Sequence, residues 1–228
     1  MINRILLDIE TQRDFFSTDG SCYRPQADKV ATQIWRLFGW ARSNGIPVIS
    51  TVLRVRKFER GPLPCPVPYC VEDTEGEKKF SKAILPRRIN LGLRNSTDLP
   101  SNIFKHYQQV IFEKRDTDIF AHARAERLIT ELPQGASFII CGAGISFGIV
   151  QAAVGLRTRG FSVILATDAV LELPEEVCEM ANLRMDAKCV LRATTSEIIA
   201  RATPRRPFKV DGAVKVNAAA IRHAHRKL

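Results

Sequence analysis

The stretch SFIICGAGISFG, residues 137–148, indicates the fold class of this chain. Its first half is a short apolar run, typical of a buried strand. Its second half passes through Gly142 and Gly144 into a helix that we predict from Ser146 to Arg159. A buried strand that turns through glycines into a helix is part of a βαβ unit. The sequence therefore predicts an α/β protein in which residues 137–141 form the central strand of a mainly parallel sheet.

The remaining elements follow from hydrophobic periodicity and turn signals, which alternate between strand and helix along the chain. Residues 54–100 lack such periodicity and are rich in proline and charge, so we predict a long functional loop or insertion there. Five or six parallel strands with alternating helices make a three-layer α/β/α, doubly wound sheet of Rossmann-like topology. The other predicted strands cover 5–9, 47–53, 109–114, 162–166 and 189–192, and the other helices cover 26–44, 119–132, 174–186 and a short stretch from Thr195 to before Pro204.

Length and composition limit the class of protein. The 228 residues can bury one good core, and the hydrophobic fraction of 45% and charged fraction of 25% are those of a globular protein. There is no apolar run of about 18 residues, so no membrane span is expected. The N-terminus is charged too early for a signal peptide, so we expect a cytoplasmic location. We predict one domain over residues 1–203 and a basic tail over 204–228.

The net charge of +10 is concentrated near the C-terminus. Residues 201–228 hold eight Lys/Arg against Asp211 alone and supply +7, which leaves +3 for the rest of the chain. The body of the protein therefore carries no sign of a basic groove, and nucleic acid is not an expected partner. The six cysteines are too few for a disulfide scaffold. Cys65 and Cys70 are not followed by a second Cys/His pair, so we predict neither a metal nor a cofactor.

Polar residues at the carboxyl ends of the predicted strands are the candidate site, because doubly wound sheets bind ligands there. A carboxylate and a lysine that end neighbouring buried strands form a plausible acid/base pair, each shifting the pKa of the other. The alternative is that both are solvated strand-end residues, and it stays open. The residues at these ends are Asp8 and Glu10, Arg54, Lys114, the Gly142–Gly148 turn and Asp168.

The glycine-rich turn offers backbone N–H groups at the start of a helix, where an anion can bind. Its spacing matches neither of the glycine patterns of nucleotide-binding loops. The simpler alternative is that the glycines only allow the helix to pack against the sheet.

Four segments, in this order, resemble the isochorismatase-like hydrolases, which include nicotinamidases, carbamoylsarcosine amidohydrolases and isochorismatase. The resemblance covers residues 5–200 and implies an α/β hydrolase with a small-molecule substrate that forms a homodimer or homotetramer. The segments are LDIETQRDFF (7–16) beside the family's D-x-Q-x-D-F signature, YCVEDTEGEKK (69–79) beside H-C-V-x-G-T-x-G, VIFEK (110–114) with Phe120 beside its strand-lysine-phenylalanine element, and CGAGISFGI (141–149) beside its G-x-x-T-x-x-C-V turn.

The resemblance also implies roles for particular residues. Glu10, Lys114 and position 148 would be catalytic, and Gly144, Phe15, Phe120 and Arg54 would contact the substrate. Glu10 stands where the family has aspartate, which moves the carboxyl group by about 1 Å, and a misplacement of that size can cost about 10²-fold in rate. Asp8 lies two residues earlier, on the same strand face, and is the less favoured acid.

Gly148 stands where the family has its nucleophilic cysteine, so a thioester cannot form at this position. Ser146 and Cys141 are the nearest replacements, and neither is expected to serve: Ser146 faces a different direction and Cys141 lies within the strand. The histidine metal ligands of nicotinamidase-like members are also missing, because Leu53-Arg54-Val55 and Tyr69 occupy their places. A nicotinamidase is therefore not expected.

Two functions remain compatible with the missing cysteine. Isochorismatase proper is similar in having glycine there, because a vinyl ether is cleaved by protonation of the enol carbon and attack of water, with no covalent step. Glu10 would be the acid, Lys114 would orient it, and the backbone amides of Gly144 and Gly148 would orient substrate or water. Arg54 and Arg56 would receive a substrate carboxylate. The alternative is a catalytically inactive member that binds a small molecule or serves assembly.

Overall fold

The computed structural model describes residues 2–173 and 176–202. Its strands form one seven-stranded sheet in the order β3-β4-β2-β1-β5-β6-β7, in which all neighbours are parallel. The predicted α/β class is confirmed, with slightly more strands than expected. The strands are β1 (Arg4–Ile9), β2 (Val48–Leu53), β3 (Arg88–Asn90), β4 (Gln109–Lys114), β5 (Ser137–Ala143), β6 (Ser162–Leu171) and β7 (Leu191–Ala193).

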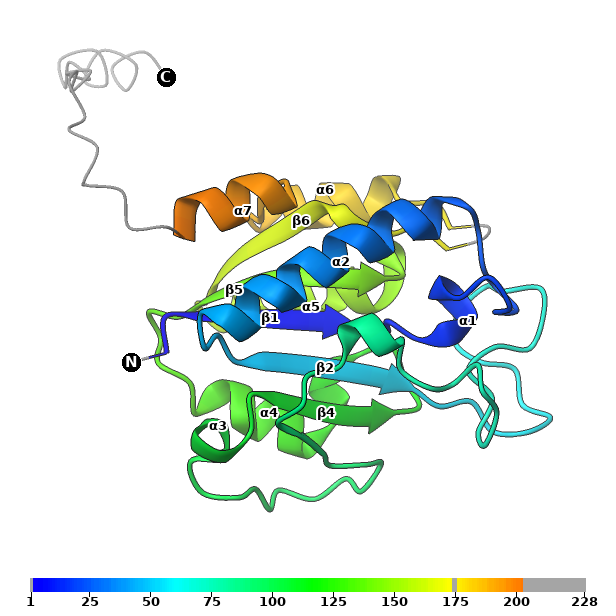
Figure 1. The fold of residues 1–228 in the computed structure, drawn as a ribbon, viewed down its shortest axis with the longest axis horizontal. Coiled ribbons are helices and arrows are strands. Elements are labelled where there is room, and N and C mark those ends of the chain that lie inside the picture. The colour runs from blue at the N-terminus through cyan, green and yellow to red at the C-terminus, as the bar shows by residue number, and fades with distance from the viewer. Residues whose placement is uncertain (1, 174–175, 203–228) are drawn as a thin grey trace, which may run out of the picture.

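Helices cover both faces of this sheet (Figure 1). The helices α2 and α7 lie on one face, and α4, α5 and α6 lie on the other. Short 3-10 turns cover Ser81–Ala83 and Ile119–Ala121, and a π-helical turn covers Ile145–Ile149. The helices are α1 (Arg13–Phe16), α2 (Gln26–Ser43), α3 (Ile103–His106), α4 (Ala123–Thr130), α5 (Val150–Thr158), α6 (Glu179–Ala187) and α7 (Thr195–Ala202).

Two predictions about the sheet are corrected. The middle strand is β1, with β5 beside it, so residues 137–141 are next to the centre rather than at it. Strand β6 continues past Asp168 to Leu171, with a register shift against β5 between Ile140 and Gly142. Asp168 therefore lies inside a strand, where its carboxylate accepts hydrogen bonds from the N–H and hydroxyl of Thr195 and caps α7.

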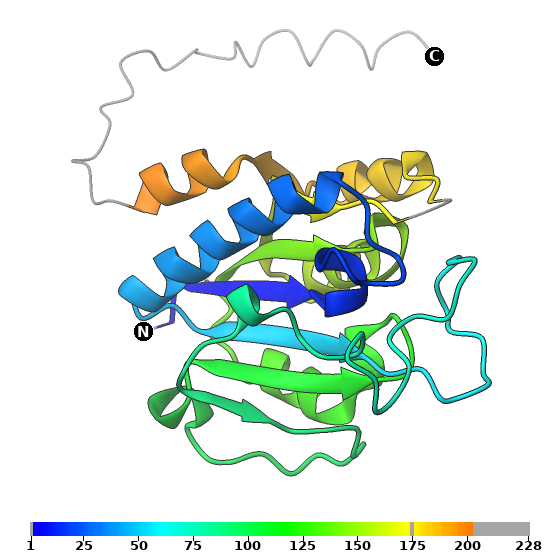
Figure 2. The same cartoon turned by 45° about the vertical axis from the view of Figure 1, so that its right-hand side comes forward.

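The helix predicted over 119–132 is interrupted near its start. Asp118 accepts from the N–H of Phe120 and caps a 3-10 turn, and α4 begins only at Ala123. The predicted loop 54–100 also contains two short elements, the 3-10 turn Ser81–Ala83 and the edge strand β3, whose three residues each are too few for a periodic signal. The part of this loop that follows β2, drawn in cyan, extends past the arrowhead ends of β1 and β2 (Figure 2).

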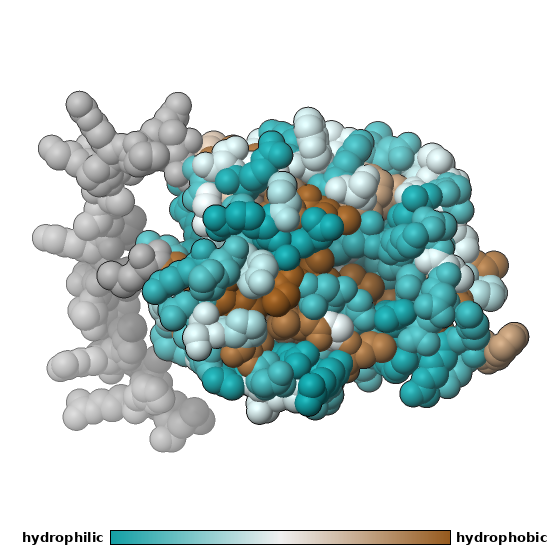
Figure 3. Space-filling view, turned by 60° about the horizontal axis from the view of Figure 1, so that its bottom comes forward, coloured by the Kyte–Doolittle hydropathy of each residue, from teal (hydrophilic) through white to brown (hydrophobic). Residues whose placement is uncertain are grey.

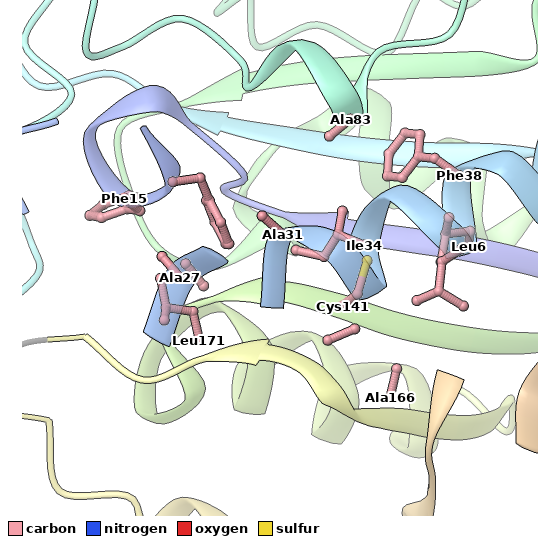
Figure 4. Packing of buried hydrophobic residues seen from close by; sticks show 14 of the residues in the cluster. Leu6, Phe15, Ala27, Ala31, Ile34, Phe38, Ala83, Cys141, Ala166 and Leu171 are labelled. Carbon is pink, nitrogen blue, oxygen red and sulfur yellow. The ribbon is translucent and has the colours of Figure 1, made fainter. Parts of the chain in front are cut away.

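Each face of the sheet has its own apolar core. Successive residues of β1 alternate between them, because strand side chains point to opposite faces. Leu6 packs under α2, while Ile5, Leu7 and Ile9 pack under α4 and α5. Figure 4 shows Ile34 and Phe38 of α2 directed at the sheet, where Leu6 and Cys141 lie. Burying each such leucine or isoleucine contributes about 1.5–3 kcal/mol, which fixes the sheet on which the site is built.

A groove of about 970 Å³ lies at the amino ends of the strands, lined by residues of segments 2–4, 44–47, 99–105 and 127–133. Figure 3 brings the α3 and α4 side forward and shows apolar residues gathered in a hollow among polar ones. This groove is at the opposite end of the sheet from the candidate site. Within the described residues, no helix has the length and apolar character needed to cross a membrane. The predicted tail, residues 204–228, lies outside the part of the chain that the structure describes.

Candidate active site

Glu10 follows directly after β1 and adopts a left-handed backbone conformation, with φ of +52°. This conformation is uncommon for a residue with a side chain and costs roughly 1–2 kcal/mol. Hydrogen bonds hold it in place. The N–H of Glu10 donates to Thr51 Oγ1 at 3.2 Å, and its carbonyl accepts from the N–H of Gln12 at 2.8 Å.

This backbone turn separates the carboxylates of Asp8 and Glu10, which a regular strand would place on one face. Glu10 reaches Lys114. On β4, Lys114 points to the same face as Val110 and Phe112, which pack in the core under α4 and α5. Asp8 stays on the α2 face, where it accepts hydrogen bonds from Ser50 and Thr11 and forms an ion pair with Lys79. The expectation that the two carboxylates share a face is therefore wrong, because the strand ends at Ile9.

The side chains of Glu10 and Lys114 form a buried ion pair, with exposed fractions of 0% and 4%. Lys114 Nζ donates to Glu10 Oε1 and also to the carbonyl oxygens of Asp116 at 2.7 Å and Thr117 at 2.9 Å. Glu10 Oε2 is buried and has no hydrogen-bond partner among the described residues. Burial raises the pKa of Glu10, and the charge of Lys114 opposes this shift only in part. The carboxyl group is thus held at one oxygen and free to carry a proton at the other.

Gly148 lies against this carboxyl group. A Cβ atom built on it would be 2.8 Å from Cγ2 of Ile9, 3.1 Å from Oε1 of Glu10 and 3.3 Å from the carbonyl oxygen of Thr117. Contacts under 3.4 Å are tighter than almost all real Cβ contacts. A side chain at this position would therefore require Ile9 and Glu10 to shift.

The glycine-rich turn after β5 is already occupied by groups of the chain itself. Gly144 has a φ of +79°, and its N–H donates to the carbonyl of Leu171 at 3.0 Å. The expectation that this amide orients a substrate is not met in this geometry, because the donor is engaged. The N–H of Ser146 donates to the carboxylate of Glu176, which also accepts from the N–H of Leu173 at 2.7 Å. A carboxylate at this turn agrees with the predicted preference for an anion.

Neither replacement nucleophile is set up for attack. Cys141 is fully buried, and burial raises the pKa of its thiol well above the usual value, with Asp8 adding to the effect. The hydroxyl of Ser146 donates to the carbonyl of Val177 at 2.8 Å. In the described part of the chain there is also no group of three or more His, Cys, Asp or Glu side chains arranged to hold a metal ion.

The predicted substrate contacts lie elsewhere. Arg54 is held by ion pairs with Glu77 and Glu113, both at 2.9 Å. Phe15 is buried against the ring of Tyr69, with centroids 6.1 Å apart. Phe120 packs on α5, where the guanidinium of Arg159 lies 3.8 Å above its ring. Of the residues predicted for the site, the structure brings Glu10, Lys114 and Gly148 together.

Two contributors were not predicted. Lys79 enters the sheet end from the long loop and pairs with Asp8 at 2.6 Å. The carbonyl oxygens of Asp116 and Thr117 fix the ammonium group of Lys114. Lys79 lies at the end of the segment 69–79, which resembles a family motif. A charged residue in a segment expected to pack near the site was the one sequence signal for its role. Backbone carbonyls carry no sequence signal.

A cavity of about 220 Å³ borders Lys114 on the side away from β2. Its size admits only a small ligand, since ligand pockets commonly measure about 300–1,000 Å³. Glu10 does not line it. The lining residues are Leu93, Asn95, Glu113, Lys114, Arg115, Asp116, Ala121 and His122.

The parallel sheet with helices on both faces defines this protein as a doubly wound α/β domain (Figure 1). A buried acid–lysine pair lies at the carboxyl end of its sheet, beside a glycine-rich turn. Residues 4–198 match the model of the Isochorismatase domain, and the chain belongs to this family. Family membership supports the predicted class of enzyme, a hydrolase. No match is found among curated protein sequences.

Solved structures of the family share the fold. An isochorismatase-like hydrolase from Alkaliphilus metalliredigens is 16% identical with a TM-score of 0.62, covering 87% of this chain and 98% of that one. N-carbamoylsarcosine amidase from Thermoplasma acidophilum is 12% identical with a TM-score of 0.62, over 85% and 96% of the two chains. A nicotinamidase from Bacillus subtilis is 19% identical with a TM-score of 0.61, over 84% and 99%. At these identities the similarity is one of fold.

Proposed function

We propose that this protein is an isochorismatase-family hydrolase that acts without a cysteine nucleophile, with Glu10 as the general acid on a small substrate. The observation that carries the proposal is the Glu10 carboxyl group, bound through Oε1 to Lys114 and buried without a partner at Oε2. A general acid needs a proton and a free oxygen from which to give it. Gly148 fits this chemistry because no covalent step requires a side chain there.

Burial supports the acid role of Glu10. A general acid must hold its proton until the substrate arrives, and desolvation raises the pKa of this carboxyl group. Lys114 orients the group through Oε1 and limits the shift, which keeps the acid reactive. The carbonyls of Asp116 and Thr117 in turn fix the direction of the ammonium group.

The reaction we propose is hydrolysis of a vinyl ether or of a similarly activated small compound. The O–H bond at Oε2 breaks as the proton forms a C–H bond at the enol carbon, which leaves an oxocarbenium ion and a carboxylate on Glu10. Water adds to the cationic carbon and gives one proton back to Glu10, which forms a hemiketal. The ether C–O bond of the hemiketal then breaks as its hydroxyl proton passes to the leaving oxygen, which yields a ketone and an alcohol.

A carboxylated substrate stays part of the proposal, but Arg54 does not support it. Its guanidinium group is already paired with Glu77 and Glu113, so receiving a substrate would require breaking these pairs. We also propose that the protein forms a homodimer or homotetramer in the cytoplasm, as the family resemblance implies.

The alternative function is that of an inactive family member that binds a small molecule or serves assembly. One observation favours it: the Glu10 side chain is fully buried and does not line the cavity beside Lys114. On this view the ion pair is a structural remnant that holds the ends of β1 and β4 together.

Turnover measurements separate the two functions. The full chain is assayed against isochorismate and a panel of small amides, together with Glu10→Gln and Lys114→Ala. For the hydrolase, Glu10→Gln is expected to lower kcat by about 10²–10⁴-fold, the usual contribution of a positioned acid. Glu59→Gln, an exposed change of the same kind, is expected to leave kcat unchanged.

Turnover that neither Glu10→Gln nor Lys114→Ala reduces contradicts the proposed acid. Absence of turnover on every substrate, combined with a rise in melting temperature on adding a small carboxylic acid, supports the binding function instead.

A further inference from the structure

A second buried acid–lysine pair lies behind the first, on the other face of the sheet. Lys79 Nζ is 2.6 Å from Asp8 Oδ2, and the two side chains are 5% and 0% exposed. Lys79 reaches this position because the long loop pairs with the chain after β1 through an antiparallel bridge between Gln12 and Lys79. Burying two charges has a large desolvation cost, which their mutual attraction must offset. Attachment of the loop alone therefore does not account for the pair.

The pair is connected to Glu10 through the residues on either side of it. Lys79 Nζ donates to Thr11 Oγ1 at 2.6 Å and lies 3.4 Å from the carbonyl oxygen of Thr51. Thr11 Oγ1 donates to Asp8 Oδ1 at 2.8 Å. Thr51 Oγ1 accepts the N–H of Glu10. Lys79 therefore contacts both Thr11, the residue after Glu10, and Thr51, whose hydroxyl accepts the N–H of Glu10.

We propose that Asp8 and Lys79 are positioning residues for Glu10: they hold its left-handed backbone and set the electrostatic field at its carboxyl group. The inference rests on the proposed role of Glu10 as the acid. The strained conformation persists because the surrounding contacts over-determine it.

The two members of the pair act on Glu10 with opposite sign. The positive charges that face it are Lys114 and Lys79, and both lower its pKa, whereas Asp8 raises it. The Cys70 thiol also faces it, and burial keeps that group neutral by raising its pKa well above the usual value. An intact Asp8–Lys79 pair therefore acts on the pKa of Glu10 in two opposing ways, and removing either member leaves the effect of the other.

This opposition gives a test that a merely structural role does not pass. The pKa of Glu10 is measured by carbon-13 NMR of the carboxyl group in the full chain, in Asp8→Asn, Lys79→Met and the double variant. Asp8→Asn is expected to lower this pKa and Lys79→Met to raise it, each by about one unit, the low end of what a nearby charge does. The double variant is expected to return close to the original value.

Lys82→Met, an exposed lysine three residues further along the same loop, is the matched control and is expected to leave the pKa unchanged. Shifts of the same sign in both single variants, or no shift in either, overturn the proposal. If Lys79→Met does not fold, the nearly isosteric Asp8→Asn decides alone: a lowered pKa supports the proposal, and an unchanged or raised pKa overturns it.

The titration needs no turnover, so it separates this inference from the proposed function. If the protein shows no turnover but the two variants shift the pKa of Glu10 in opposite directions, the positioning role is supported and the role of Glu10 as general acid is not. Where turnover is found, the fall of kcat/KM at high pH reports the loss of the Glu10 proton. That fall is expected to move to higher pH in Lys79→Met and to lower pH in Asp8→Asn.

Discussion

A Cβ atom at position 148 would lie 3.1 Å from Oε1 of Glu10 and 2.8 Å from Cγ2 of Ile9. The extra methylene of glutamate, relative to aspartate, thus extends into the space that a nucleophile's side chain would need. This contact joins positions 10 and 148, the two places where the resemblance implies a departure from the family pattern. We therefore expect a glutamate at position 10 to favour a glycine at position 148, and an aspartate at position 10 to leave more room there.

Adding a methyl group at position 148 is therefore expected to destabilise the fold. Gly148→Ala places the new carbon against Ile9 and Glu10, and overpacking of this kind costs about 1–3 kcal/mol. Combining it with Glu10→Asp is expected to recover part of this cost, since residues in contact show coupling of about 0.5–3 kcal/mol. Urea unfolding of both single variants and the double variant measures the coupling.

Gly39→Ala is the matched control, because Gly39 lies in α2 and a Cβ there has nothing within 4 Å. This change is expected to stabilise the protein by about 0.5–1 kcal/mol, the usual gain of alanine over glycine in a helix. Equal effects at positions 39 and 148, or strict additivity of Gly148→Ala and Glu10→Asp, would contradict the proposed steric link.

The raised pKa of Glu10 predicts how its contribution to stability depends on pH. The folded state holds this proton more tightly than the unfolded state, whose pKa is near 4.5. The contribution is therefore fully present below about pH 4.5 and is lost as pH rises through the folded pKa. The measurement is the free energy of unfolding of the wild type minus that of Glu10→Gln, from pH 4 to 9. In this difference the contributions of the other titrating groups cancel. A difference that grows with pH would mean that Lys114 outweighs burial.

Removing the cation of the pair is expected to be costly and pH-dependent. Lys114→Met leaves a buried carboxyl group without its partner, and breaking a buried pair in this way costs about 3–5 kcal/mol. The loss is expected to be smaller at pH 5 than at pH 8, because a protonated Glu10 needs no cation. Lys29→Met, on the exposed side of α2, is the control and is expected to change stability by less than about 0.5 kcal/mol. A pH-independent loss would argue against a titrating Glu10.

Arg54 is expected to act on the long loop rather than on the substrate. Its guanidinium group joins Glu77 of the loop to Glu113 of β4, so Arg54→Gln leaves these two carboxylates without their shared cation. We expect faster limited proteolysis within residues 54–87 and little change in KM for any substrate that is turned over. A raised KM with unchanged proteolysis would instead restore Arg54 as a receiver of the substrate.

The fold could largely be predicted from the sequence because its central strands are buried on both faces and helices α2 and α4 have clear apolar stripes. The limits of β2, β4 and α2 follow such patterns to within one residue. The edge strand β3 was missed because it is short and half exposed, and pairing with β4 alone defines it. The length of β6 was missed because its register shift near Gly142 depends on the neighbouring strand.

At the site, pairing of Glu10 with Lys114 could be predicted from strand ends, since parallel strands place their carboxyl ends at one edge. The separation of Asp8 from Glu10 could not, because a single left-handed residue reverses the side-chain alternation and leaves no compositional trace. The sequence also could not predict that the N–H of Gly144 and the guanidinium group of Arg54 bind other groups of the same chain. Their partners, Leu171, Glu77 and Glu113, are distant along the chain.

The complete burial of Glu10 has a consequence for how any ligand would be captured. A molecule that touches Oε2 must meet a form of the protein in which the segments around this carboxyl group have opened. Its measured affinity is then the intrinsic affinity reduced by the fraction of time spent open, so an open population of about 1% weakens binding about 100-fold. Capture would be limited by the opening rate at high ligand concentration. Burial would thereby keep water from this carboxyl group until a ligand takes its place.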